Sequence, residues 1–190
     1  MKKISLVIVL ALFGLLANAQ TAPAVKFPAV DSSPLDAAYF PANAPKVKKG
    51  DESMPVIKVL YSRPARKGRT VFGVLEQYDK VWRLGANENT EIYFDRAVTI
   101  GDQKLKPGKY SLFAIPTKDK WTIIVNKQTD RWGAFTYDQA KDIARVDVPT
   151  TTLEKPLENF SIVFTDQAEG AHMIMAWDTV QVTLPIGFKK

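Results

Sequence analysis

Apolar and polar residues alternate along a series of short runs in this chain, and that pattern limits it to a β-rich fold. From Pro55 onward the runs are PVIKVLYSRP, EIYF, KYSLFAIP, KWTIIVNK, IARVDV, NFSIVFTD, HMIMAWD and TVQVTLPI. In the last run every second residue from Val180 to Ile186 is apolar, and Gln181 and Thr183 lie between them. Successive side chains of a strand point to opposite faces, so the alternation predicts strands with one face in a core and one in water.

Turn residues separate these runs, for example Lys-Pro-Gly at residues 106–108 and Lys-Asp at residues 118–119. Proline presets φ for a turn and glycine supplies positive φ. About eight short strands at close spacing predict an all-β fold, either a single antiparallel β-sandwich of jelly-roll or Ig-like type or a barrel. We expect at most a turn or two of helix, near residues 137–144.

The first 19 residues, MKKISLVIVLALFGLLANA, follow the plan of a secretory signal peptide. Two lysines precede an apolar run, which ends in the small-x-small sequence Ala-Asn-Ala. A membrane anchor is the alternative, but the apolar run is short for a spanning helix and no charged cluster follows it. We expect cleavage after Ala19 and export, to the periplasm or to the extracellular or outer-membrane-associated space. The chain has no cysteine that could carry a lipid anchor.

Residues 20–53 are expected to form an extended N-terminal arm or linker, because they are rich in Pro, Ala and Lys and show no sustained period. The adjacent aromatics Tyr39 and Phe40 indicate that part of this arm is held against other residues. Residues 54–190 are expected to form the β-sandwich domain. One domain of this size buries a core without needing disulfides.

Charge and residue inventory exclude several classes of function. The chain has 26 basic and 20 acidic residues, and its mild, scattered positive charge argues against a nucleic-acid partner. After signal cleavage, no segment is long and apolar enough to span a membrane.

Without cysteine, thiolate catalysis and Cys-ligated zinc are impossible, and the lone His172 excludes a two-His metal site. A histidine alone on a strand is more often a packing or surface residue than a catalyst. The chain also lacks the loop motifs for calcium, nucleoside triphosphates and dinucleotides, so we expect no metal and no cofactor.

Residues 81–92, VWRLGANENTEI, form the first candidate ligand-binding stretch. Trp82, Arg83, Asn87 and Glu88 suit a polar ligand, because an indole stacks while amide and guanidinium groups bond hydroxyls or carboxylates. The alternative is a rigid polar loop in which the same groups satisfy one another and bind no ligand.

A second candidate stretch, SRPARKGRTVFG at residues 62–73, concentrates four cations, Arg63, Arg66, Lys67 and Arg69. Such a cluster suits carboxylate, sulfate or phosphate groups, although it is equally typical of a solvated loop.

The third stretch, TDRWGAFTYDQ at residues 129–139, interleaves aromatics with charges and contributes Trp132 and Tyr137 as candidates. If this loop meets the Trp82 loop, the two would form an aromatic-lined polar cleft. The hypothesis fails if the two tryptophans lie at opposite ends of the fold.

Glu88 is also the candidate for catalysis. Glycoside hydrolysis needs two carboxyl groups facing each other across a cleft, and the sequence does not identify a partner for Glu88. The alternative is a glutamate bonded to an arginine or to backbone amides of its own loop.

The motifs YSRPARKGRTVFG, VWRLGANENTEI, LKPGKYSLFAIP, KWTIIVNK and RWGAFTYD resemble those of DUF2911, an exported bacterial family of unknown function that is common in Bacteroidetes. The likeness runs from about Tyr61 to Ile186. The stretch VLEQYDKVW departs from it, since Val74 and Glu76 stand where a second glycine and a less charged residue are expected. The resemblance implies an exported β-rich domain and brings no catalytic residues.

Three functions remain open from the sequence. The first is a non-enzymatic binding module for a polar small molecule or glycan, held by the candidate residues named above. The second is a structural or assembly protein of the cell envelope, whose arm docks on another protein. The third, least favoured, is a carboxylate-based glycoside hydrolase that uses Glu88. The oligomeric state is undetermined.

Overall fold

A computed structural model of the chain describes residues 24–46 and 54–188. The chain divides into two units, residues 1–30 and 31–190. Of the first unit the structure describes residues 24–30, which contain no helix or strand. The predicted signal peptide, residues 1–19, lies outside the described residues.

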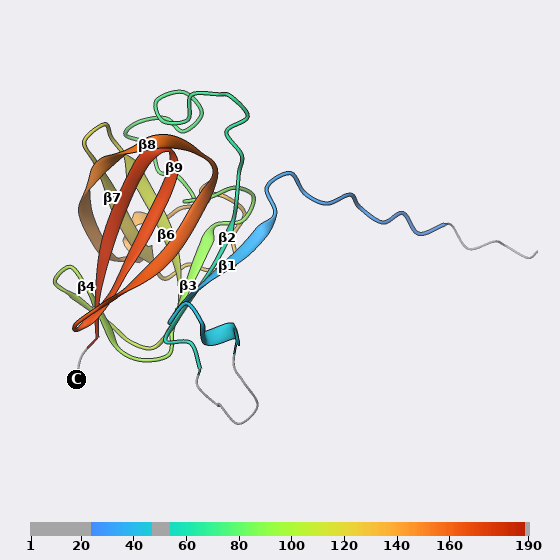
Figure 1. Ribbon diagram of the computed structural model, residues 1–190. Coiled ribbons are helices and arrows are strands. Elements are labelled where there is room, and N and C mark those ends of the chain that lie inside the picture. The colour runs from blue at the N-terminus through green and yellow to red at the C-terminus, as the bar shows by residue number, and fades with distance from the viewer. Residues whose placement is uncertain (1–23, 47–53, 189–190) are drawn as a thin grey trace, which may run out of the picture. The chain divides into compact units, whose positions relative to one another are not determined.

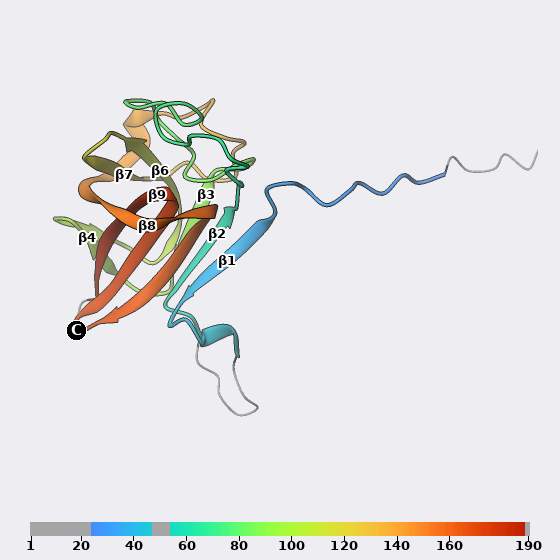
Figure 2. The ribbon, with the colours of Figure 1, turned by 45° about the horizontal axis from the view of Figure 1, so that its top comes forward.

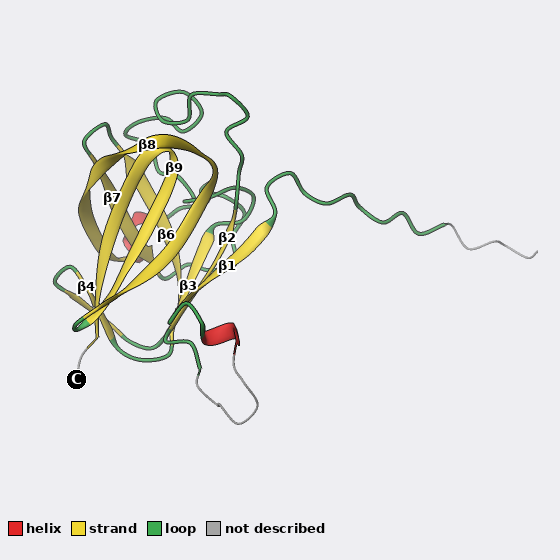
Figure 3. Cartoon of the chain, viewed as in Figure 1, coloured by secondary structure: helices red, strands yellow, loops and turns green. Residues whose placement is uncertain are grey.

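The described residues of the second unit form nine strands and two short 3-10 helices (Figure 1, Figure 3). Along the chain the strands are β1 (Leu35–Phe40), β2 (Ile57–Ser62), β3 (Thr90–Phe94), β4 (Val98–Ile100), β5 (Gln103–Leu105), β6 (Gly108–Pro116), β7 (Lys120–Asn126), β8 (Asp142–Gln167) and β9 (Gly170–Phe188), with η1 (Ala44–Lys46) and η2 (Gln139–Lys141) between them. They form one sheet in the order β1-β2-β3-β6-β7-β8-β9-β4-β5, and all neighbours are antiparallel. The predicted all-β antiparallel class is confirmed, and η2 falls where the sequence allowed a turn of helix.

Two pairs of predicted short strands are each one long, bent strand. IARVDV and NFSIVFTD both belong to β8, and HMIMAWD and TVQVTLPI both belong to β9. β8 pairs with β7 up to Pro149 and with β9 from Thr150 onward, with register shifts on both sides of Leu157. Figure 2 shows β8 and β9 curving together around the unit, so that one sheet carries two facing halves.

The first strand, β1, lies inside residues 20–53, the segment that is predicted from the sequence to be an extended arm. It pairs with β2 along its whole length, from Leu35 opposite Ser62 to Phe40 opposite Ile57. Phe40 is buried, with its ring 6.2 Å from that of Phe164 and 5.3 Å from that of Phe188. The sequence does not predict this strand, for two reasons. The segment LDAAYF is short, and the residues around it are rich in proline.

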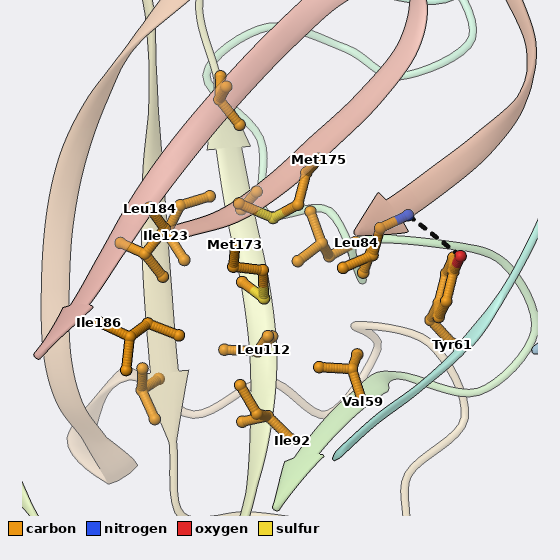
Figure 4. Close-up of a cluster of buried hydrophobic side chains, with 14 of the residues drawn as sticks. Val59, Tyr61, Leu84, Ile92, Leu112, Ile123, Met173, Met175, Leu184 and Ile186 are labelled. Atoms are coloured by element: carbon orange, nitrogen blue, oxygen red, sulfur yellow. Dashed lines mark hydrogen bonds between the residues drawn. The ribbon is translucent and has the colours of Figure 1, made fainter. Parts of the chain in front are cut away.

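The sheet curls until the chain after β2 bonds to β8. Arg66 N donates to Glu158 O at 2.8 Å, and Phe160 N donates to Pro64 O at 3.0 Å. Inside this curl lies one apolar core, to which both halves of the sheet contribute. Figure 4 shows residues of β2, β3, β6 and β7 facing residues of β9, with a buried hydrogen bond of 3.1 Å from Ile162 N to the Tyr61 hydroxyl.

One end of the core consists of aromatic rings. Trp82 stacks on Trp177 with ring centroids 6.1 Å apart, and meets Trp121 edge-on at 5.5 Å. Phe72 and Phe160 complete this aromatic cluster. The long connection between β2 and β3, residues 63–89, winds over this end of the unit (top of Figure 1) and carries two of the three candidate stretches.

Candidate functional site

The Trp82 loop and the Trp132 loop meet, as the cleft hypothesis requires. Asn89 N donates to Arg131 O at 3.0 Å, and Arg131 N donates to Asn89 Oδ1 at 2.8 Å. Further along, Gly133 N donates to Asn87 O at 2.9 Å. These bonds join residues 87–89 to residues 131–133 in a short antiparallel pairing, called the paired loops below.

The paired loops are fixed to the sheet by buried polar side chains. The amide of Asn89 is buried and donates to Ser111 Oγ at 2.6 Å, and Ser111 Oγ donates to Gln128 O at 2.5 Å. Thr90 Oγ1 donates to Leu84 O at 2.6 Å. Satisfied buried networks of this kind hold a loop in one conformation.

Trp82 faces the core, not the solvent. Only 3% of its surface is exposed, and its indole N–H donates to Gly85 O at 3.0 Å. The Trp82 side chain is therefore part of the aromatic cluster in the core. Other aromatic rings pack against it, so it is not available to stack on a ligand.

A cavity of about 380 Å³ opens beside the paired loops, between the connection after β2 and the Arg83–Asn87 turn. Four of the residues that the sequence singled out line it, namely Lys67, Arg69, Arg83 and Asn87. We call it the cationic cavity. Its lining is mainly polar, and among the described lining residues Glu76 alone carries a carboxyl group.

Backbone carbonyls hold the two guanidinium groups of the cationic cavity in place. Arg69 donates from Nε to Arg66 O at 2.8 Å and from Nη2 to Ala65 O at 2.7 Å. Arg83 donates from Nη1 to Asn87 O at 2.7 Å, and its guanidinium lies 5.5 Å from the centre of the Phe135 ring. A guanidinium has five N–H donors, so both groups keep donors for a further acceptor.

Two residues that line the cationic cavity adopt a left-handed backbone conformation. Lys67 and Asn87 adopt positive φ values of 48° and 56°. Non-glycine residues rarely take this conformation, and such strain is concentrated at functional sites and turns. Lys67 is held by a 2.9 Å bond from its N–H to Glu158 Oε1, and the Asn87 side chain donates to Asp31 Oδ1 at 3.0 Å.

Glu76 is a functional candidate that the sequence did not indicate. Burial raises the pKa of its carboxyl from 4.5 to about 7, while the nearby charge of Arg83 acts in the opposite direction. Glu76 also lines a neighbouring cavity of about 230 Å³ that Arg83 and Phe135 share. The one signal in the sequence was its unexpected charge in VLEQYDKVW.

A different cavity, of about 410 Å³, lies where Trp132 and Glu88 meet the outer face of β2 and β3. We call it the tryptophan cavity. Trp132 is 59% exposed, and Glu88 pairs with it through the backbone. Glu88 is exposed and lines this cavity together with Glu91. The candidates that the sequence placed in one cleft therefore line two separate cavities.

Arg63 and Tyr137 lie outside both cavities and bond to other parts of the fold. Arg63 donates to Asp36 Oδ2 at 2.9 Å and to Ser161 Oγ at 2.8 Å, which links β1 to β8. The Tyr137 hydroxyl donates to Asp142 Oδ2 at 2.6 Å, and burial together with this carboxylate raises the pKa of Tyr137 to about 12.

Two further observations concern the described residues alone. Their His, Asp and Glu side chains form no group of three or more that could hold a metal ion. None of their helices has the length and apolar character needed to cross a membrane.

Comparison with known proteins identifies the family. A family model described as "Protein of unknown function (DUF2911)" matches residues 44–186. Neither the curated proteins nor the solved structures contain a match to the chain. The family match extends from η1 almost to the end of β9. It includes the segments between β2 and β3 and between β7 and β8, which carry the paired loops. The protein therefore belongs to the DUF2911 family of proteins of unknown function.

Proposed function

We propose that this protein is exported and binds, without catalysis, a small molecule that carries a carboxylate or phosphate group. The ligand is held in the cationic cavity. One observation carries the proposal, namely that Lys67, Arg69 and Arg83 converge on a single polar cavity of about 380 Å³. Pockets that bind small ligands are typically of this size or larger.

The arrangement suits an anion because its guanidinium groups are already positioned. Backbone acceptors fix Arg69 and Arg83, so little side-chain entropy remains to be lost when a ligand binds. Guanidinium groups form paired hydrogen bonds with carboxylate and phosphate oxygens. Lys67 is exposed and adds a further positive charge to the lining.

Glu76 adds a second requirement for the ligand. A carboxyl group whose pKa is about 7 is partly protonated at neutral pH, so it both donates and accepts hydrogen bonds. A ligand with a hydroxyl or amino group beside its anionic group would form hydrogen bonds with the Glu76 carboxyl. Hydrolysis of glycosides in the cationic cavity is less favoured, because that reaction needs two carboxyl groups and Glu76 supplies the one carboxyl group among the described lining residues.

A thermal-unfolding screen of residues 20–190 tests the proposal. The panel holds phosphate, sulfate, citrate, uronic acids, hydroxy acids, amino acids and nucleotides. A ligand at 100 times its dissociation constant stabilises the protein by about 2.7 kcal/mol, which raises Tm by several degrees. The variant Arg69→Gln should lose that shift, because it removes the cation and keeps a polar amide in its place.

The matched control is Arg96→Gln, which removes an arginine that pairs with Asp95 in the turn between β3 and β4. It should keep the full shift. An absence of any shift across the panel, or an equal shift in Arg69→Gln, would rule out this use of the cationic cavity. The exported state is checked separately by the N-terminal sequence of the protein isolated from its native cells, which should begin after Ala19.

A further inference from the structure

We propose that the tryptophan cavity is a second binding site, which holds a neutral or amino-substituted pyranose ring of a glycan against the indole of Trp132. This inference is independent of the proposed function, because the two cavities have different lining residues.

The exposure of Trp132 is unusual within this chain. The other tryptophans, Trp82, Trp121 and Trp177, are at most 3% exposed, whereas Trp132 is 59% exposed. A mobile loop would allow the indole to fold away from water. Here the backbone on both sides is held, by the bond from Asn89 N to Arg131 O and by that from Gly133 N to Asn87 O. The backbone is thus fixed at the residue whose ring lines the cavity.

The cavity combines the two kinds of surface that a sugar ring needs. Trp132, Leu35 and Leu60 supply apolar surface for the C–H face of the ring. Glu88 and Arg131 supply charged acceptors and donors for hydroxyl groups at its edge. The volume of about 410 Å³ is that of a small-ligand pocket.

The charge of the residues around the tryptophan cavity determines which sugars it favours. Three carboxyl groups line the cavity, those of Glu88, Glu91 and Asp130, and the lining contributes one cation, Arg131. Lys109 lies within 3.3 Å of Glu91 Oε1 and also pairs with Asp130, so it neutralises part of this charge. The remaining negative charge favours neutral or amino sugars and disfavours uronic acids.

Tryptophan fluorescence of residues 20–190 provides the test, because acrylamide reaches an exposed indole far more readily than a buried one. The probes are cellohexaose, chitohexaose and a glucosamine hexamer, with oligogalacturonate as the anionic comparison. We expect at least one of the first three to protect Trp132 from quenching and to shift the emission to the blue. Oligogalacturonate should protect at least tenfold less well at equal concentration.

Variants then assign the site, with binding measured by calorimetry so that the loss of Trp132 does not remove the signal. Trp132→Ala should abolish binding of the protecting sugar, and Glu88→Gln should weaken it about tenfold. The exposed residues Phe27 and Glu154 provide matched controls, and Phe27→Ala and Glu154→Gln should bind as the wild type does. Arg69→Gln should also bind the sugar normally, which separates this site from the cationic cavity.

Three outcomes would overturn the proposal. The first is that none of the sugars protects Trp132. The second is that Trp132→Ala and Glu88→Gln bind the sugar as tightly as the wild type. The third is that Trp132 becomes protected as protein concentration rises without sugar, which would identify its surroundings as a contact between copies of the chain.

Discussion

Glu76 illustrates how the surroundings of one residue set its chemistry. Its half-buried carboxyl lies near Arg83, and burial raises its pKa from 4.5 to about 7. Below pH 4.5 the group is protonated in both the folded and the unfolded chain. As pH rises from 4.5 to 7 the unfolded chain releases its proton first, so the folded state loses stability relative to it. Above pH 7 the folded state carries the full destabilisation that comes from ionising the Glu76 carboxyl.

We therefore predict that Glu76→Gln stabilises the protein in a pH-dependent manner. The amide carries no charge at any pH, so the variant should gain about 2 kcal/mol more in the free energy of unfolding at pH 8 than at pH 5. Urea denaturation at the two pH values measures the difference. Glu154→Gln, at an exposed position, should show almost none. Equal gains at both pH values would mean that Glu76 titrates normally.

At the scale of elements, the paired loops join the segment between β2 and β3 to the segment between β7 and β8. They also fix both segments to the sheet. Asn89 is their common anchor, since its side chain donates to Ser111 Oγ and accepts from Arg131 N. Both cavities are adjacent to this pairing. Loop residues held by a rigid scaffold thus form part of the wall of each cavity, the usual arrangement for binding sites on β folds.

Asn89→Ala should lower the free energy of unfolding by about 1–3 kcal/mol, because it leaves buried polar groups without partners. It should also release the loop that carries Trp132, and so change the quenching of that indole. Urea denaturation and acrylamide quenching measure the two effects. Gln103→Ala, on the exposed part of β5, is the control and should change neither. If the free energy of unfolding falls as predicted but the quenching of Trp132 is unchanged, other contacts hold the loop.

At the scale of the whole second unit, the folded core extends beyond the residues that the family model matches. The match covers residues 44–186, while Phe40 and Phe188 lie just outside it at either end. These two rings pack against each other, and Phe40 also meets Phe164. β1 covers the edge of β2, which would otherwise expose unpaired backbone groups.

A chain of residues 44–186 should therefore be less stable than one of residues 31–190. The loss of the buried Phe40 alone is expected to cost about 3–5 kcal/mol, and the uncovered β2 edge should promote association. Urea denaturation and light scattering check the two parts. Phe40→Ala in the longer chain separates the effect of the ring from that of the strand. Equal midpoints for both chains would contradict a structural role for β1.

Local sequence pattern was sufficient to predict most of the strands, because alternation of side chains is a property of adjacent residues. It also identified the loops that carry the two cavities, since glycine, asparagine and clustered charges are local signals. It did not show that four of the predicted strands are two long ones. Continuity through the bends of β8 depends on its pairing with β9, which lies later in the chain.

The difference between Trp82 and Trp132 depended on contacts between residues far apart in sequence. Both stand next to an arginine in a glycine-containing loop, yet one is 3% and the other 59% exposed. Trp82 is enclosed by rings from β7, β8 and β9, whereas Trp132 lies on the outer face of the sheet. The raised pKa of Glu76 has the same origin, because burial is produced by the folded chain as a whole and no local pattern encodes it.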